Sequence, residues 1–314
     1  MSRIPVSIIV CTFNREETLR VTMRSILANK VPENFDAELL IVDNASTDDT
    51  KQAVASMQSE KIPVRYVHES RKGLSNARNR GVAEAKGDIL LFTDDDLRPP
   101  KQWLEAMCAP IVEGRSDAVL GGVEMAPRLA RPWMGPVHRG YLACTGPFLE
   151  RHRPGNVLIT PSMALSRKIF QRVPRFDSEL GCGALGFHED GLFSWQLARA
   201  GFTFECVKVV SEHHFSEERL LRSSFLAAAR RMGRSSAYVA WHWNHKEVRL
   251  PRLQSLLASF KLAAYRAKHP GADGEGCAEA EIRLEQDAAF FKRYLVESRR
   301  PRNYERRGLA KRDS

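Results

Sequence analysis

The chain has 314 residues, of which 43% are hydrophobic and 27% charged, proportions that are typical of a globular protein with a sizeable core and exclude a mainly disordered chain. No run approaches the roughly 18 to 20 apolar residues that a membrane-spanning helix needs, and the first residues lead into a strand pattern rather than a cleavable signal, so we expect a cytoplasmic protein. The formal charge is +10, and six single cysteines without CxxC spacing argue against a zinc knuckle, a redox motif or a disulfide framework.

Strand and helix patterns alternate in the first third of the chain. Continuous apolar, β-branched runs lie at 6–13, 38–42, 64–67 and 88–92, as expected for strands that are buried on both faces. Helix-compatible segments lie between them, at 16–28, 48–57 and 74–85. This alternation predicts an α/β fold, with a mixed, mainly parallel central sheet flanked by helices.

The regular alternation loosens beyond this point, where prolines become frequent and one strand pattern, at 156–165, is clear. A helix at 189–200, a strand at 202–210 and helices at 220–240, 253–267 and 278–295 are then predicted. We therefore expect a main domain at 1–220 and a helical C-terminal extension at 221–298.

Residues 299–314 form a basic tail, with seven basic residues against Glu305 and Asp313, which is half of the net charge of the chain. We expect this tail to be solvated and disordered. An anionic membrane surface is the first functional alternative, and nucleic acid is the least favoured partner.

Polar side chains follow three of the predicted buried strands. In open α/β sheets, ligands bind at the carboxyl ends of the parallel strands, so a site is best sought there. The residues are Thr12 and Asn14 after the first strand, Asp43 and Asn44 after the second, and Asp94, Asp95 and Asp96 after the strand at 88–92. The sequence thus predicts that they share one edge of the sheet.

The three adjacent carboxylates at 94–96 repel one another unless a cation compensates them. A Mg²⁺ or Mn²⁺ ion held between Asp96 and a diphosphate is the natural compensation. The alternative is a turn or cap cluster before a helix expected at 101–108. His213, or its neighbour His214, follows the strand at 202–210 and is a candidate nitrogen ligand for the same metal.

Two strand-to-helix turns are candidates for nucleotide contacts. The position of Asp43 at a strand end favours contact with a base or ribose. The alternative is that Asp43 is only a turn residue. Gly73 and Arg78 open a helix, where free backbone N–H groups and a guanidinium can face a phosphate. The alternative there is a glycine turn with a solvated arginine.

Glu189 and Asp190 follow the glycine-rich segment GCGALG at 181–186, which matches GxGxxG but lacks the hydrophobic strand that a dinucleotide fingerprint needs before it. We interpret this segment as a flexible active-site loop that brings a substrate hydroxyl to a carboxylate general base. The alternative for the acidic pair is a favourable charge at a helix N-terminus.

Six short segments occur in a fixed order: TFNR at 12–15, VDNASTDDT at 42–50, GLSNARNRG at 73–81, FTDDD at 92–96, ED at 189–190 and HHFSEERL at 213–220. This set resembles glycosyltransferase family 2, the inverting enzymes of the GT-A fold, over roughly residues 4–240. The resemblance implies transfer of a sugar from a nucleotide-sugar, usually a UDP-sugar, with Mn²⁺ or Mg²⁺ bridging the diphosphate.

Matching positions carry the family's roles onto this chain. The resemblance implies nucleoside contacts for Thr12, Asn14 and Asp43, a place beside the ribose and diphosphate for Asp94 and Asp95, a metal carboxylate in Asp96 and the general base in Asp190. We expect Asn44, Gly73 and Arg78 to help bind the nucleotide-sugar, Glu189 to act beside Asp190, and His213 to bind the metal.

We therefore expect a metal-dependent glycosyltransferase, catalytic in residues 1–220, that acts on a hydroxyl of a glycan or lipid-linked acceptor in polysaccharide or glycoconjugate synthesis. A nucleotidyltransferase-like enzyme, which would release pyrophosphate, and a non-catalytic nucleotide-binding scaffold are the alternatives. Trp241, Trp243, the segment 253–267 and the basic tail suit peripheral contact with the inner face of a membrane. Core packing and a dimer interface are equally ordinary interpretations of these segments.

Overall fold

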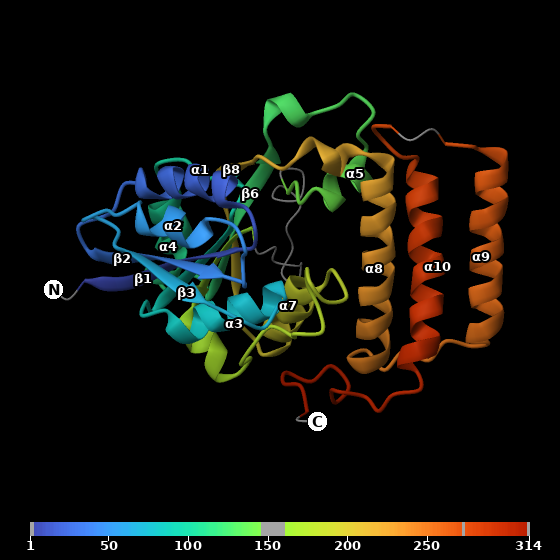
Figure 1. Ribbon diagram of the computed structural model, residues 1–314. Coiled ribbons are helices and arrows are strands. Elements are labelled where there is room, and N and C mark those ends of the chain that lie inside the picture. The colour runs from blue at the N-terminus through green and yellow to red at the C-terminus, as the bar shows by residue number, and fades with distance from the viewer. Residues whose placement is uncertain (1–2, 146–160, 272–273, 313–314) are drawn as a thin grey trace.

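The structure is a computed structural model that describes residues 3–145, 161–271 and 274–312. The described residues form an eight-stranded mixed sheet with helices on both faces, and three long helices stand beside it (Figure 1). This is the α/β class predicted from the sequence. Within the described ranges, each helix is either too short or too polar to cross a bilayer.

One half of the sheet is parallel, in the order β3-β2-β1-β4. Its strands are β1 (Ile4–Thr12), β2 (Phe35–Asp43), β3 (Val64–His68) and β4 (Ile89–Asp94). One face packs on α1 (Glu16–Leu27), α2 (Thr50–Ala55) and α4 (Trp103–Val112), and the other packs on α3 (Leu74–Glu84) and α7 (Glu189–Arg199). Because both faces are covered, these strands are continuous apolar runs, as the sequence indicated.

The other half of the sheet is mixed. Its strands are β5 (Leu97–Arg98), β6 (Ala118–Met125), β7 (Ser162–Ser166) and β8 (Phe204–His213). β7 runs antiparallel to both β4 and β6, and β8 runs parallel to β6. Of the strand predicted at 156–165, residues 156–160 lie outside the described ranges. The short connecting elements are η1 (Pro127–Leu129), α5 (Pro136–Tyr141), η2 (Arg167–Gln171) and η3 (Glu217–Leu220).

β6 was not predicted, because Gly121 and Gly122 interrupt its apolar run. The structure gives a reason for the first of these glycines. A Cβ at Gly121 would collide with the Ser162 hydroxyl on the neighbouring strand. Close packing of the two strands therefore requires a glycine, and this glycine interrupts the apolar run by which a strand is recognised.

The helical extension consists of α8 (Arg222–His242), α9 (Pro251–Lys268) and α10 (Glu279–Glu297). α10 lies between α8 and α9, and α9 is farthest from the sheet (Figure 1). Gly233 of α8 lets α10 approach closely, since a Cβ there would collide with the carbonyl oxygen of Gln286. Buried polar contacts, including His242 Nε2 to Glu297 Oε2 at 3.1 Å, join α8 to α10.

The basic segment expected to be disordered is instead packed against the rest of the protein through residue 312. It runs back below α8 toward the sheet (Figure 1). Tyr304 is 2% exposed, and its hydroxyl donates to Asp177 Oδ2 at 2.7 Å. Lys311 Nζ lies 3.0 Å from Asp177 Oδ1, and Trp243 Nε1 donates to the carbonyl oxygen of Gly308. The expectation of disorder rested on the net charge of the segment, which gives no indication of these buried contacts.

Candidate active site

The carboxyl ends of β1, β2 and β4 meet at one edge of the sheet, as predicted. The register pairs Thr12 with Asp43 and Cys11 with Asp94, so the three strands end level with one another. Thr12 is buried, and its hydroxyl donates to Asp95 Oδ2 at 2.7 Å. The first strand therefore holds the acidic turn that follows the fourth.

Asp95 is the buried anchor of this acidic turn. Arg15 Nη1, just after β1, lies 2.8 Å from Asp95 Oδ1 and 3.0 Å from Asp96 Oδ2. Thr22 of α1 donates to the main-chain oxygen of Asp95. Burial raises the pKa of Asp95 to about 6, although the guanidinium of Arg15 acts in the opposite direction.

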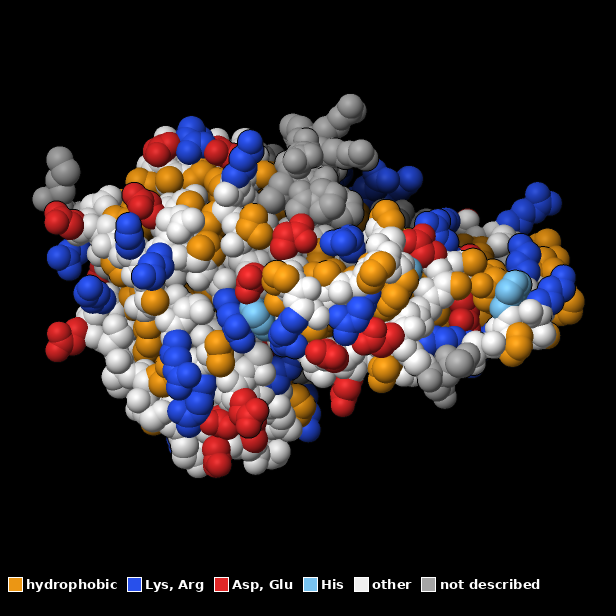
Figure 2. All heavy atoms as spheres, turned by 90° about the horizontal axis from the view of Figure 1, so that it is seen from above, with side chains coloured by type: hydrophobic (Ala, Val, Ile, Leu, Met, Phe, Trp, Pro, Cys, Tyr) orange, Lys and Arg blue, Asp and Glu red, His pale blue; other side chains and the backbone are white. Residues whose placement is uncertain are grey.

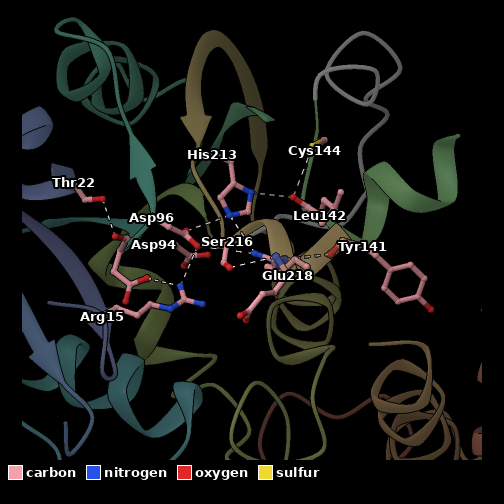
Figure 3. Close-up of polar contacts among 12 residues, drawn as sticks. Arg15, Thr22, Asp94, Asp96, Tyr141, Leu142, Cys144, His213, Ser216 and Glu218 are labelled. Carbon is pink, nitrogen blue, oxygen red and sulfur yellow. Dashed lines mark hydrogen bonds and ion pairs between the residues drawn. The ribbon is translucent and has the colours of Figure 1, made fainter. Parts of the chain in front are cut away.

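Asp96 and His213 lie against each other, with 3.2 Å between Asp96 Oδ1 and His213 Nε2 (Figure 3). His213 Nδ1 lies 3.0 Å from the carbonyl oxygen of Leu142. A carbonyl only accepts, so Nδ1 carries the hydrogen and the lone pair of a neutral ring is on Nε2. Asp96 Oδ1 is buried and has no hydrogen-bond donor among the described residues. The two buried atoms therefore need a proton or a metal cation between them.

Two guanidinium groups lie beside this pair of atoms. Arg219 Nη1 lies 3.4 Å from His213 Nε2 and 4.0 Å from Asp96 Oδ2, the oxygen that Arg15 also contacts. Burial raises the pKa of Asp96, but His213, Arg15 and Arg219 outweigh it and hold that pKa well below the usual range. Asp96 is therefore an anion that cationic side chains stabilise.

The structure separates the two adjacent histidines. His214 Nε2 lies 2.6 Å from Glu212 Oε2, and the side chain of that glutamate is half exposed. His213, by contrast, is 2% exposed and lies at Asp96. Of the two candidates, His213 is the one placed to share a metal with Asp96.

The described residues contain no group of three or more His, Cys, Asp or Glu side chains arranged to hold a metal ion. Asp96 and His213 supply one hard oxygen and one imidazole nitrogen, donors that suit Mn²⁺ or Mg²⁺. These cations commonly take their remaining ligands from water and substrate phosphates. The donor set thus fits a metal that binds together with an anionic substrate.

Arg78 is buried and paired, so it is not the solvated arginine of the alternative interpretation, and its contact with a phosphate stays a prediction. Its Nη1 lies 2.8 Å from Glu189 Oε1, and its Nη2 lies 3.6 Å from Asp94 Oδ1. Burial and the neighbouring Asp190 raise the pKa of Glu189 to about 7. The pairing of Glu189 favours a positioning role for it beside Asp190.

Asp190 lies in the first turn of α7, directly behind the glycine-rich loop at 181–186. Its Oδ1 accepts the N–H of Gly191 at 2.7 Å, and its side chain is half buried. The loop packs on the start of α3, because the N–H of Leu74 donates to the carbonyl oxygen of Cys182. Gly73, with a φ of 124° in the region that favours glycine, permits this approach. The glycine loop, Gly73 and Asp190 are thus brought together.

The turns after β1 and β2 are held by their own polar side chains. Asp43 accepts the N–H of Ser46 through Oδ1 and the hydroxyl of Tyr66 through Oδ2, at 2.9 and 2.6 Å. Asn44 Oδ1 accepts the N–H of Gly73, and Asn14 Oδ1 accepts the N–H of Thr47. These residues order the edge of the sheet, and their direct contact with a nucleotide stays a prediction.

Arg15, Tyr66 and Arg219 are polar site residues to which the sequence analysis gave no role. Arg15 and Arg219 stood inside the motifs TFNR and HHFSEERL, so a cationic residue within a motif that carries other candidate site residues was the available signal. Tyr66 lies within a strand pattern and offered no such signal. Its importance comes from β3 pairing with β2, which places it beside Asp43.

Comparisons with known proteins agree with this geometry. The sequence model of the family described as Glycosyl transferase family 2 matches residues 7–173. Glycosyltransferase AglE of Haloferax volcanii is 31% identical over 121 residues, which are 38% of this chain and 39% of that protein. The match thus spans well under half the length of that relative.

Solved structures of similar fold include the mannosyltransferase PcManGT from Pyrobaculum calidifontis in complex with GDP-Man and Mn²⁺. It aligns with a TM-score of 0.59 at 17% identity, over 95% of this chain and 87% of that one. Residues 1–349 of S. aureus TarS, in complex with UDP-GlcNAc, align with a TM-score of 0.52 at 19% identity, over 84% of this chain and 74% of that one. These likenesses establish the fold, which is GT-A.

Proposed function

Because the chain belongs to glycosyltransferase family 2, we propose that it transfers a sugar from a nucleotide-sugar donor to a hydroxyl of an acceptor, with inversion at the anomeric carbon. The observation that carries this proposal is the buried pair of Asp96 Oδ1 and His213 Nε2, which lie 3.2 Å apart beside Arg15 and Arg219. Asp96 and His213 suit a cation, and the two neighbouring arginines suit an anionic substrate.

Asp96 and His213 would hold the metal, as Mn²⁺ or Mg²⁺. When bound, such an ion neutralises charge on the diphosphate that leaves. Arg15 and Arg219 flank the site and bind the same diphosphate, because a guanidinium matches the geometry of phosphate oxygens. The Nδ1–H of His213, donated to Leu142, keeps Nε2 turned toward Asp96.

Asp190 is the general base in this proposal. Its carboxylate takes the proton of the acceptor hydroxyl while that oxygen attacks the anomeric carbon and the bond to the nucleoside diphosphate breaks on the opposite side. Glu189, fixed by Arg78, sets the first turn of α7 and so the direction of Asp190. One displacement of this kind inverts the anomeric centre.

The donor we propose is a UDP-sugar. Asp43, at the end of β2, offers carboxylate oxygens to a ring N–H of the base, with Tyr66 fixing its rotamer. Phe13 is exposed at the same edge, and Lys72 lies over its ring. Of the two solved structures described above, one is in complex with GDP-Man and the other with UDP-GlcNAc, and the binding experiment below decides between the bases.

The acceptor we propose is a glycan or a lipid-linked glycan. A cavity of about 160 Å³ lies beside Arg219, between the turn after α5 and the start of α8. Its lining includes Tyr141, Phe187 and Phe225, together with Arg231. Aromatic faces suit sugar rings, and the two arginines suit an acceptor that also carries an anionic group.

The test is calorimetric binding of UDP, GDP, CDP and dTDP to the purified protein, each with Mn²⁺, with Mg²⁺ and with EDTA. We expect selective UDP binding that needs the metal and is lost in Asp96→Asn. Absence of binding by every nucleoside diphosphate would contradict the proposed function. Release of pyrophosphate from a nucleoside triphosphate would instead identify a nucleotidyltransferase.

A further inference from the structure

The outer face of α9 is apolar and faces solvent. Leu253, Leu256, Leu257 and Phe260 follow one another at spacings of three, one and three residues, which places them on one side of a helix. Leu256 is 69% exposed and Phe260 is 71% exposed. Large side chains of this kind normally face the core of a helical layer.

Packing within this chain does not explain that face. α9 contributes one buried residue, Ala258, and it rests on α10 by its opposite side. α10 separates it from α8, and α9 is the helix farthest from the sheet (Figure 1). A contiguous exposed patch of this kind marks an interaction surface.

Basic residues border the apolar stripe. Residues 248–271 contain five Lys or Arg and no Asp or Glu. Arg252, Lys261 and Lys268 are exposed, and by helical period they flank the stripe on both sides. In the view from above, orange and blue side chains alternate over this end of the molecule (Figure 2). Arg266 is the exception, because it turns inward to Glu281 and Glu285.

The start of α9 adds an open hollow of about 430 Å³ with the same character. Leu250, Leu253 and Leu295 supply its apolar lining, and Arg252 and Arg299 supply its charge. Leu250 itself is 60% exposed. The apolar surface therefore continues from α9 to the end of α10.

We propose that α9 lies in the plane of a membrane that contains anionic lipids. Leu253, Leu256, Leu257 and Phe260 enter the boundary between headgroups and acyl chains, and Arg252, Lys261 and Lys268 bind the lipid phosphates. An apolar stripe between basic flanks is what an interfacial helix requires. This surface goes beyond the proposed function and does not depend on it.

Charge favours the membrane over a second copy of this chain. A two-fold contact between α9 faces would bring Arg252, Lys261 and Lys268 of each copy toward those of the other, and no acidic residue in 248–271 would offset them. An anionic bilayer covers the apolar stripe and neutralises the flanks in one contact. The basic segment at 299–312 is not needed, since Tyr304 and Lys311 bind Asp177.

The test is sedimentation of the full chain with vesicles of phosphatidylcholine alone and of equal parts phosphatidylcholine and phosphatidylglycerol. We expect the protein to sediment with the anionic vesicles and to stay in solution with the neutral ones. The double variant Leu256→Gln with Phe260→Gln should fall to the level without vesicles. The triple variant Arg252→Gln, Lys261→Gln and Lys268→Gln should do the same.

The matched control is Val112→Gln with Val210→Gln, which changes two exposed apolar residues of the sheet domain and should sediment like the unchanged chain. Circular dichroism melts and UDP binding, unchanged in the α9 variants, separate loss of membrane binding from loss of folding or of donor binding. Failure of the unchanged chain to sediment would overturn the proposal. So would a dimer in light scattering that Leu256→Gln with Phe260→Gln dissociates.

Discussion

Arg78 Nη1 and Glu189 Oε1 lie 2.8 Å apart in the interior, although they stand 111 positions apart in the chain. The same guanidinium lies 3.6 Å from Asp94. One buried cation therefore connects the acidic turn after β4 to the helix that carries Asp190. In the proposed reaction, this link would fix the position of the general base relative to the donor.

Replacing Arg78 by Met should destabilise the protein by about 3–5 kcal/mol, because a buried carboxylate would lose its partner. Denaturant unfolding followed by circular dichroism measures this. Arg80→Met is the matched control, since Arg80 is half exposed and pairs with Glu84 on the surface of α3. A similar loss in both variants would contradict a special role for the buried pair.

Asp190→Asn should reduce sugar transfer by about 10²–10⁴-fold, the usual contribution of a general base. UDP binding should stay as it is, because the amide keeps the shape of the carboxylate at the N-terminus of α7. Release of nucleoside diphosphate gives the rate, and calorimetry gives the affinity. Glu179→Gln, an exposed carboxylate earlier in the same segment, should change neither. Loss of UDP binding in Asp190→Asn would place this residue on the donor side instead.

His213→Ala should weaken the Mn²⁺-dependent part of UDP binding by at least about tenfold, since even outer-shell partners of a metal contribute this much. His214→Ala should leave it unchanged, because that ring pairs with Glu212. Binding in EDTA supplies the reference for both variants. Equal effects of the two substitutions would argue against the assignment of His213 to the metal.

The helical extension should lose stability in acid. Burial raises the pKa of Glu281, but Arg222 and Arg266 outweigh it and hold that pKa below its ordinary value of 4.5. A carboxyl with a lowered pKa in the folded state stabilises the fold above its ordinary value, and this contribution is lost as the pH falls through the lower, folded value.

Thermal melts recorded between about pH 3 and pH 7 should therefore show a fall in melting temperature below about pH 4.5. Glu281→Gln should flatten that fall. Glu247→Gln, at a side chain that is 85% exposed, should leave the profile unchanged. A profile that is identical in all three proteins would show that Glu281 does not contribute.

The parallel strands could be predicted because burial on both faces leaves a continuous apolar run, as in Ile8, Ile9 and Val10 of β1. β6 could not, since Gly121 is selected by a close neighbour rather than by burial of its own side chain. The helices of the extension were predicted because their apolar residues recur at helical spacing. In α9 that same spacing marks a face that stays exposed.

The site was predictable where function follows from position at a strand end. Asp94, Asp95 and Asp96 follow β4 directly, so their chemistry could be inferred from local sequence alone. Arg15 could not be inferred in this way, because it reaches Asp95 over 80 positions of chain. The separation of His213 from His214 likewise required the fold, which turns one ring inward and the other toward Glu212.

The hydrogen bonds of Asp177 constrain the order in which parts of this chain fold. Besides the N–H of Glu179, the donors to this buried carboxylate are Tyr238, Tyr304 and Lys311, which follow it by 61, 127 and 134 positions. During synthesis the last strand of the sheet, which ends at His213, is made well before Tyr304 and Lys311. The nascent sheet domain must therefore keep this acidic group hydrated until the downstream chain arrives, so its final closure is a late event of folding.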